Sequence, residues 1–204
     1  PLSKSRPLGL GARRYLQLLR PGTHQLVHLA ERAGFPWWFQ QVNRDLGHLG
    51  QFSNGLLSRQ SPQAVEAHAL PGLKGRGIIV SRFGEGEHSL LVLNVHLALS
   101  AKARFHQFAY IHRVIEHAPH VVLMGDLNCT HEELRRSPIG DRQWQWLEEE
   151  LHTYPSWKPQ KQIDHILVSD RLHVHSVEVL NERLSDHRPL AVELDLPPGL
   201  YLPP

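Results

Sequence analysis

The sequence predicts an α+β fold in which a few helices cover packed sheets. Three observations favour it: many short segments have the apolar or alternating pattern of strands, two or three have the period of helices, and the C-terminal half is rich in strands. The sequence contains no internal repeat or low-complexity linker. We therefore expect one domain over residues 1–204, with an irregular basic start at 1–22, a core at 23–196 and a tail at 197–204.

Helices are expected where the 3.6-residue apolar period is bounded by capping residues or helix breakers. These segments span residues 23–33, 102–117 and 141–151. Gly34 and Pro119 end the first two, because glycine favours the conformation that follows a helix and proline cannot continue one. The second helix is amphipathic, and we expect Phe105 and Phe108 on the face that packs against the core.

Strands are expected where short apolar or alternating runs are bounded by turn residues. These segments span residues 55–59, 77–82, 89–97, 120–124, 163–169, 172–180 and 190–196. A glycine-rich turn at 83–87 joins the second and third segments into a hairpin. Within 172–180 the alternation changes phase between Val174 and Val177, which indicates a bulge or bend.

Composition excludes several classes of protein. Apolar residues make up 41% of the chain and charged residues 21%, which is typical of a globular protein rather than a disordered one. No apolar run approaches the roughly 18 to 20 residues that cross a bilayer. The single cysteine, Cys129, excludes an internal disulfide and a cysteine-rich metal site. We expect a soluble monomer, with the cytoplasm favoured, and a solvated basic start rather than a nucleic-acid-binding patch.

Four polar clusters lie at the ends of predicted strands. They are Asn94-Val95-His96-Leu97, Gly125-Asp126-Leu127-Asn128, Ile163-Asp164-His165-Ile166 and Ser185-Asp186-His187-Arg188-Pro189. A rigid sheet fixes such groups while the adjoining loops stay open to substrate. Asp and Asn offer the hard oxygens that Mg²⁺ or Mn²⁺ prefers, and a His beside a carboxylate can act as a general base.

In this order and strand context, the clusters resemble those of the endonuclease/exonuclease/phosphatase superfamily, which includes pancreatic-type deoxyribonucleases, abasic-site endonucleases and neutral sphingomyelinases. The match covers roughly residues 50–196 and includes two minor motifs, Asn54-Gly55-Leu56-Leu57-Ser58-Arg59 and Arg104 with Gln107. The resemblance implies a four-layer α/β/β/α sandwich of two mostly antiparallel sheets. It also implies hydrolysis of a phosphate ester with Mg²⁺ or Mn²⁺ as cofactor.

The resemblance implies a role for each residue of the clusters. Asp126 would orient the attacking water or hold metal, and Asn128 would help to position the nucleophile and the phosphate. His187 would contact the scissile phosphate, and Asp164 would orient that histidine. His96 would stabilise the charge of the phosphate.

Further residues are candidates for metal and substrate contacts. Asp186 is similar to a metal-site carboxylate of the family, beside Asp126. Arg59, Trp157 and Lys158 are candidate substrate-binding residues. An aromatic and a basic residue together can stack a nucleic-acid base and hold its backbone, although they could equally meet a lipid head group.

Some neighbouring residues are expected to be structural. His165 follows Asp164 on a strand, so its side chain should point to the opposite face of the sheet. Asn94 and Arg188 are expected to support the fold, and Trp144 is expected in the core.

The chain departs from the family's pattern at its start. The family begins with a strand that carries an Asn and a strand that ends in Gln-Glu, whose Glu is the chief metal ligand. Neither pattern is found in the sequence, and Pro1 falls just after the place where the second strand should end. We therefore expect a fold that is incomplete at the N-terminus, an exposed sheet edge and weak metal binding.

The favoured function is Mg²⁺-dependent hydrolysis of phosphodiester bonds in DNA or RNA, since no long insertion builds a deep pocket and an open groove suits a strand. One alternative is a phospholipid or phosphoinositide phosphoesterase of the same family, and another is a catalytically inactive binding module. A zinc protein is also considered, because His173 and His175 share one face of a strand. No third zinc ligand is apparent from the spacing.

Overall fold

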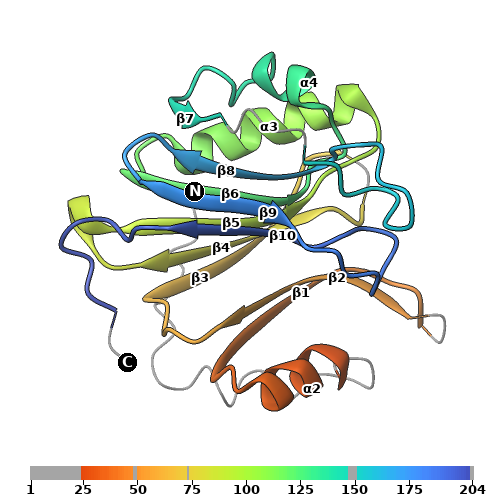
Figure 1. Ribbon diagram of the computed structural model, residues 1–204, viewed down its shortest axis with the longest axis horizontal. Helices are drawn as coiled ribbons and strands as arrows, with labels where there is room; N and C mark the ends of the chain where they lie inside the picture. Colours follow the sequence, from red (N-terminus) through yellow and green to blue (C-terminus); the bar gives the residue numbers. More distant parts are fainter. Residues whose placement is uncertain (1–23, 48–49, 73, 147–150, 203–204) are drawn as a thin grey trace.

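A six-stranded sheet forms the centre of the molecule. The computed structural model describes residues 24–47, 50–72, 74–146 and 151–202. The strands of the sheet are β3 (Ala64–Ala69), β4 (Gly77–Phe83), β5 (Leu90–His96), β6 (His120–Asp126), β7 (Trp144–Gln145) and β8 (Asp164–Ser169). Their order is β3-β4-β5-β6-β8-β7 (Figure 1). Only β5 and β6 are parallel, so the chain crosses between them through α3 (Ala101–Ile115).

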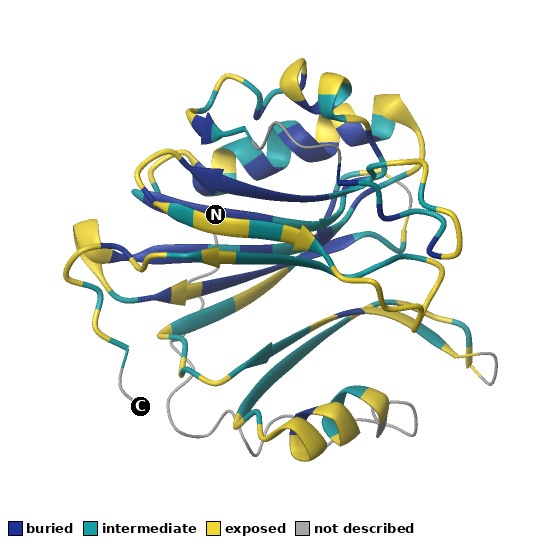
Figure 2. Ribbon diagram, in the orientation of Figure 1, coloured by how far each residue is buried: buried dark blue, intermediate teal, exposed yellow. Residues whose placement is uncertain are grey.

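Two helices, α3 and α4 (His131–Arg135), cover one face of this sheet (Figure 1). Phe108, Ile111 and Ile115 of α3 form one hydrophobic cluster with Ile78 of β4 and Leu93 of β5. Figure 2 shows that buried residues are concentrated on the central strands and on the side of α3 that faces them. The main core therefore lies between α3 and the six-stranded sheet.

The opposite face of the sheet is covered by two separate pairs of strands. One pair is β1 (Trp37–Asp45) with β2 (Gln51–Ser58), and the other is β9 (Val174–Val179) with β10 (Leu190–Leu194). Helix α2 (His24–Ala33) lies beyond the β1–β2 pair (Figure 1). A second hydrophobic cluster packs Val122, Ile166 and Val168 of the sheet against Val174 and Val192. The fold is thus the expected α+β sandwich.

Side-chain amides connect the β1–β2 pair to the sheet. The Asn54 amide, on β2, donates a 2.8 Å hydrogen bond to the Gly77 carbonyl on β4. The Asn94 amide, on β5, donates a 2.8 Å bond to the Gly55 carbonyl. Asn54 and Asn94 therefore hold β2 against the sheet, as expected for Asn94.

The second layer is not the continuous sheet that the resemblance implies. Within the described ranges, β2 pairs only with β1, and β10 only with β9. A groove of about 400 Å³ separates the two pairs. Its walls and floor include Gly55, Leu56, Leu57, Asn94, Met124, Ile166, Pro189 and Leu190. The expectation of a fold that is incomplete at the N-terminus stays a prediction.

Several predicted elements need correction. The helix expected over 141–151 is wrong in its described part, because Trp144 and Gln145 form strand β7 opposite Ser169 and Val168. The indole of Trp144 is buried, as expected. Phe105 was expected to pack inward, yet it is 55% exposed.

Other expectations are confirmed or lie outside the described residues. The ladder between β9 and β10 changes register at Glu193/Leu194, which confirms the predicted irregularity. The irregular start at 1–22 and the cap at Thr23 lie outside the described residues, and the single-domain assignment stays a prediction. None of the helices in the described ranges is long and apolar enough to cross a membrane.

Candidate active site

Three predicted site residues lie side by side on adjacent strands. His96 ends β5, Asp126 ends β6 and Asp164 begins β8. His96 is the register partner of Asp126, which in turn is the partner of Asp164. Register partners project from the same face of a sheet. The strand pairing alone therefore gathers an imidazole and two carboxylates at one edge of the molecule.

His187 joins this row from the loop between β9 and β10. Its Nδ1 lies 2.7 Å from Oδ2 of Asp164, and the Thr153 hydroxyl donates to the same oxygen over 2.5 Å. The ring of Tyr154 lies 4.9 Å from the His187 ring. With Nδ1 held by the carboxylate, Nε2 of His187 remains the ring nitrogen that can meet a substrate.

Residues 153–156, which precede β8, form hydrogen bonds with the loop that carries His187. The Ser156 amide donates to the Asp186 carbonyl over 2.7 Å, and the Ser156 hydroxyl donates to the Ser185 carbonyl. The Arg188 side chain donates back to the Ser156 carbonyl, and the Arg188 amide donates to Thr153. These bonds support the structural role expected for Arg188, and they fix His187 from both sides.

The Gly125-Asp126-Leu127-Asn128 cluster depends on two unusual backbone positions. Gly125 has a φ of +136°, and a Cβ there would meet the Val95 carbonyl oxygen at 2.0 Å. Asn128 has a φ of 51°, its amide N–H donates to Oδ1 of Asp126, and its side-chain amide donates to the Leu97 carbonyl. Glycine and asparagine tolerate such conformations better than other residues.

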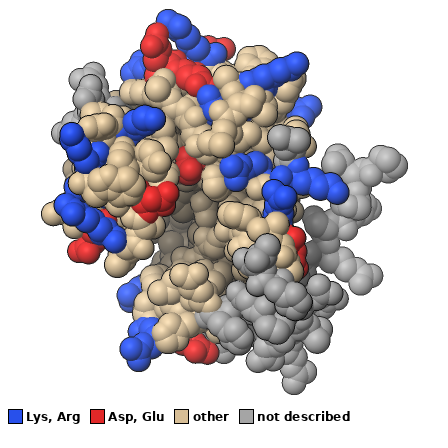
Figure 3. Space-filling view, turned by 90° about the vertical axis from the view of Figure 1, so that its right-hand side faces the viewer, with Lys and Arg blue, Asp and Glu red and all other residues tan. Residues whose placement is uncertain are grey.

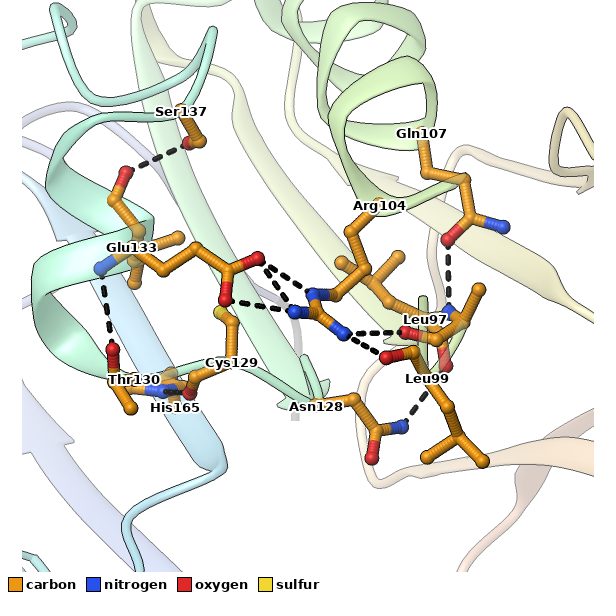
Figure 4. A network of polar contacts seen from close by, with 12 residues as sticks. Leu97, Leu99, Arg104, Gln107, Asn128, Cys129, Thr130, Glu133, Ser137 and His165 are labelled. Atoms are coloured by element: carbon orange, nitrogen blue, oxygen red, sulfur yellow. Dashed lines mark hydrogen bonds and ion pairs between the residues drawn. The ribbon is translucent and has the colours of Figure 1, made fainter. Parts of the chain in front are cut away.

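The second minor motif supports the loop that follows His96. Arg104 forms a bidentate ion pair with Glu133 of α4, with contacts of 2.6–2.8 Å. Its remaining nitrogen donates to the carbonyls of Ala98 and Leu99. Gln107 accepts from the Ala98 amide, so both residues of the motif point into the fold (Figure 4). They are structural supports between α3, α4 and the loop.

The environment of His96 keeps its imidazole neutral. Burial, followed by the electrostatic effects of Arg76 and His187, lowers the pKa of His96 to about 4, against an opposing effect of Asp164. The 3.4 Å contact between Nε2 of His96 and Asp126 is therefore not an ion pair at neutral pH. A neutral imidazole can donate one hydrogen bond to a phosphate oxygen.

The environment of Asp126 raises the pKa of its carboxyl group. Burial and the nearby charge of Asp164 raise its pKa, although the hydrogen bond from Asn128 opposes the shift. Ligand atoms of Asp126, Asp164 and His187 all lie within 4.8 Å of one another. Two crowded carboxylates are stabilised by a cation between them. This donor set fits a hard divalent ion, and it contains no glutamate within the described part of the chain.

The remaining candidates are one carboxylate next to His187 and three possible substrate-binding residues. Asp186 is exposed beside His187, and its role as a metal ligand stays a prediction. Trp157 is 61% exposed, and Lys158 is also exposed. The guanidinium of Arg59 lies 5.2 Å from the centre of the Phe35 ring. Substrate contacts by Arg59, Trp157 and Lys158 also stay predictions.

His165 lies apart from the cluster, as the strand alternation predicts. Its side chain is buried, and Nε2 lies 2.9 Å from the Cys129 carbonyl.

Figure 3 views the side of the molecule on which β5 and β6 end. Acidic side chains lie near its centre, Lys and Arg lie around them, and the surface is hollowed below.

Two residues near the site were missed from the sequence. Arg76 precedes β4 and acts electrostatically on His96 and Asp126. Thr153 binds the carboxylate that holds His187. Neither lies in a recognisable motif, and only the three-dimensional pairing of distant segments brings them to the cluster.

Comparison with known proteins places these features in context. The sequence profile of the endonuclease/exonuclease/phosphatase family matches residues 9–187. No curated protein matches the sequence.

Solved structures with a similar fold span several activities. An endonuclease/exonuclease/phosphatase family protein from Bacteroides thetaiotaomicron is 19% identical, with 84% of this chain and 79% of that chain covered and a TM-score of 0.62. A mannosyl-6-phosphatase from the same organism is 18% identical, with coverages of 85% and 82% and a TM-score of 0.62. TDP2 from D. rerio, complexed with a single-strand DNA product, is 18% identical, with coverages of 91% and 90% and a TM-score of 0.61. At these identities the likeness supports the fold alone.

Proposed function

The chain belongs to the endonuclease/exonuclease/phosphatase family, whose members are phosphoesterase hydrolases, and we propose that it hydrolyses phosphodiester bonds of nucleic acid with Mg²⁺ or Mn²⁺. The observation that carries the proposal is the alignment of His96, Asp126 and Asp164 on adjacent strands, with His187 bound to Asp164. A carboxylate-rich cluster with two histidines suits attack by water on phosphorus.

Each residue has a distinct part in the proposed reaction. Asp126 orients the attacking water together with Asn128, whose backbone amide donates to the Asp126 carboxylate. As the new P–O bond forms, the water loses a proton to the solvent, the bond to the leaving oxygen breaks, and that oxygen takes up a proton from the solvent. Neutral His96 donates to a phosphate oxygen, and His187, oriented by Asp164, contacts the same phosphate from the other side of the row.

The divalent cation is assigned to the carboxylates of this edge. Asp126 would hold it, with Asp186 as the second candidate ligand, and Asp164, which is bound to His187, would add its negative charge nearby. When bound, such a cation neutralises phosphate charge and acts as a Lewis acid. Because the donor set includes no glutamate in the described ranges, we expect weak binding that requires a large excess of Mg²⁺.

A nucleic-acid strand is the favoured substrate because the surface around the cluster is open. Trp157 is exposed next to Lys158 on the segment that leads into Asp164. An exposed aromatic ring can stack a base while the lysine contacts its phosphate. The similar fold of TDP2, solved with a single-strand DNA product, is compatible with this choice.

The proposal is tested by hydrolysis of single-stranded DNA, duplex DNA and a generic phosphodiester, each with Mg²⁺ and with EDTA. We expect Mg²⁺-dependent cleavage that His187→Ala reduces by at least about a hundredfold, as for loss of one preorganised contact to the charged transition state. His106→Ala, an exposed histidine on α3, is the matched control and should retain activity. Folded protein that cleaves none of the three substrates would contradict the proposal. Cleavage that is equal in His187→Ala and the unchanged chain would overturn the assigned roles.

A further inference from the structure

A second group of potential metal ligands lies at the opposite end of the β9–β10 pair from His187. Ligand atoms of His173, His175 and Asp195 all lie within 4.8 Å of one another. Nε2 of His175 is 2.8 Å from Oδ1 of Asp195, and the rings of His173 and His175 are 4.7 Å apart. All three residues are exposed. The sequence predicts two histidines on one face, and the structure adds the carboxylate of Asp195, the residue just after β10.

The backbone explains why these three side chains meet. The Asp195 amide donates to the His173 carbonyl over 2.9 Å, which extends the ladder beyond the last residues of the two strands. Between Val174 and Ser176 the register shifts, so His175 is the extra residue of a bulge opposite Glu193 and Leu194. A bulge re-aims a side chain and is a recurrent feature of functional sites. Val174 packs against the second hydrophobic cluster, whereas His175 and Ser176 are exposed.

We propose that His173, His175 and Asp195 form a site for a borderline divalent transition ion such as Zn²⁺, distinct from the catalytic cluster. Imidazole nitrogens suit zinc, nickel or copper, whereas Mg²⁺ prefers oxygen ligands. Three protein ligands with water at a fourth position is a common zinc arrangement, in which ligand atoms lie about 3.4 Å apart. The three ligand atoms already lie within 4.8 Å of one another on exposed side chains, which have room to rotate toward that spacing. Glu193 places a further negative charge near His175.

The bound ion would link the start of β9 to the residues just after β10. In the described residues, β9 and β10 pair only with each other, and the loop that carries His187 lies at the other end of the pair. A ligand that binds only the folded state stabilises it. The bound ion would therefore stabilise the β9–β10 pair, which carries His187.

The test measures Zn²⁺ binding to tag-free protein by calorimetry, with excess Mg²⁺ present to occupy the catalytic carboxylates. We expect one equivalent of Zn²⁺ to bind and to raise the melting temperature. His175→Ala and Asp195→Asn should each weaken binding by at least about tenfold and remove the thermal shift. His106→Ala should change neither measurement. Circular dichroism of each variant checks that these exposed substitutions leave the fold intact.

Three results would overturn the inference. In the first, Zn²⁺ fails to bind the unchanged chain, and in the second it binds the unchanged chain, His175→Ala and Asp195→Asn equally well. In the third, His187→Ala abolishes the binding of Zn²⁺, which would place the ion at the catalytic cluster. None of these results depends on enzymatic activity, so failure of this inference and failure of the proposed function are separate outcomes.

Discussion

At the scale of single residues, the orientation of His187 depends on Asp164, and Asp164 depends on Thr153. The Thr153 hydroxyl and His187 Nδ1 share one carboxylate oxygen. Thr153→Val removes the hydroxyl without changing the shape of the side chain, so a partly buried carboxylate loses a donor. We expect activity to fall by about tenfold to a hundredfold, as for other residues that orient a site ligand. Thr153→Ser should restore most of it, whereas equal losses in both variants would indicate a packing role.

His96 should make stability depend on pH. Its pKa is lowered to about 4 in the folded chain, against about 6.5 when unfolded. Between these values the unfolded chain binds a proton that the folded chain does not, so the free energy of unfolding should fall as pH decreases through this window. His96→Gln should remove this part of the pH dependence. Denaturant titrations in EDTA, at several pH values, would show parallel curves for both proteins if the imidazole titrated normally.

The sequence predicts much of the cluster, because strand ends carry His96, Asp126 and Asp164 and the strands pair in register. It does not predict the supporting contacts. Thr153 is an ordinary threonine until the chain folds back against β8, and the effect of Arg76 requires the pairing of β4 with β5. Contacts between segments far apart in the chain leave no local pattern.

At the scale of elements, the Arg104–Glu133 pair clamps α3 to α4. The Arg104 side chain is only 7% exposed, whereas that of Glu133 is 36% exposed. Glu133→Gln leaves a buried guanidinium without its carboxylate. We expect the free energy of unfolding to fall by about 1–3 kcal/mol. This loss is smaller than for a fully buried ion pair, because solvent reaches Glu133. The comparison is Glu132→Gln, whose pair with Arg136 is exposed on the same helix and should contribute less than about 1 kcal/mol. If chemical denaturation gave equal losses of unfolding free energy for Glu133→Gln and Glu132→Gln, the proposed stabilising role of the Arg104–Glu133 pair would be wrong.

Predictions of elements succeeded where the local pattern and the packing agree. Strands β5, β6 and β8 are largely apolar and buried. β5 and β8 occur within the expected segments, and β6 runs two residues beyond the expected 120–124. Helix α3 was found, but its buried face carries Arg104 and Gln107, while Phe105 points to solvent. Periodicity assigns polar residues outward, so it cannot anticipate a buried ion pair. The two-residue strand β7 likewise depends on its pairing with β8 rather than on its own sequence.

At the scale of the whole molecule, the order of layers followed from the resemblance rather than from residue patterns. Alternation identifies strands one at a time, but it does not state which strands are neighbours. The division of the second layer into two pairs was therefore found only in the structure. The strands that carry the catalytic row lie in the continuous sheet, whereas His187 comes from one of the separate pairs.

This division should make local stability uneven. Residues of β5 and β6 are largely buried, and both strands are paired on both sides. In contrast, β1–β2 and β9–β10 are two-stranded and only partly buried (Figure 2). An isolated pair of strands is marginally stable, and regions with fewer buried contacts open more readily. In native-state hydrogen exchange we expect amides of β5 and β6 to exchange slowest and those of both pairs to exchange at least about tenfold faster, a difference of about 1.4 kcal/mol in opening free energy. Exchange from β9–β10 as slow as that from β6 would mean that the pair opens only with the sheet, and that His187 is held as firmly as Asp126.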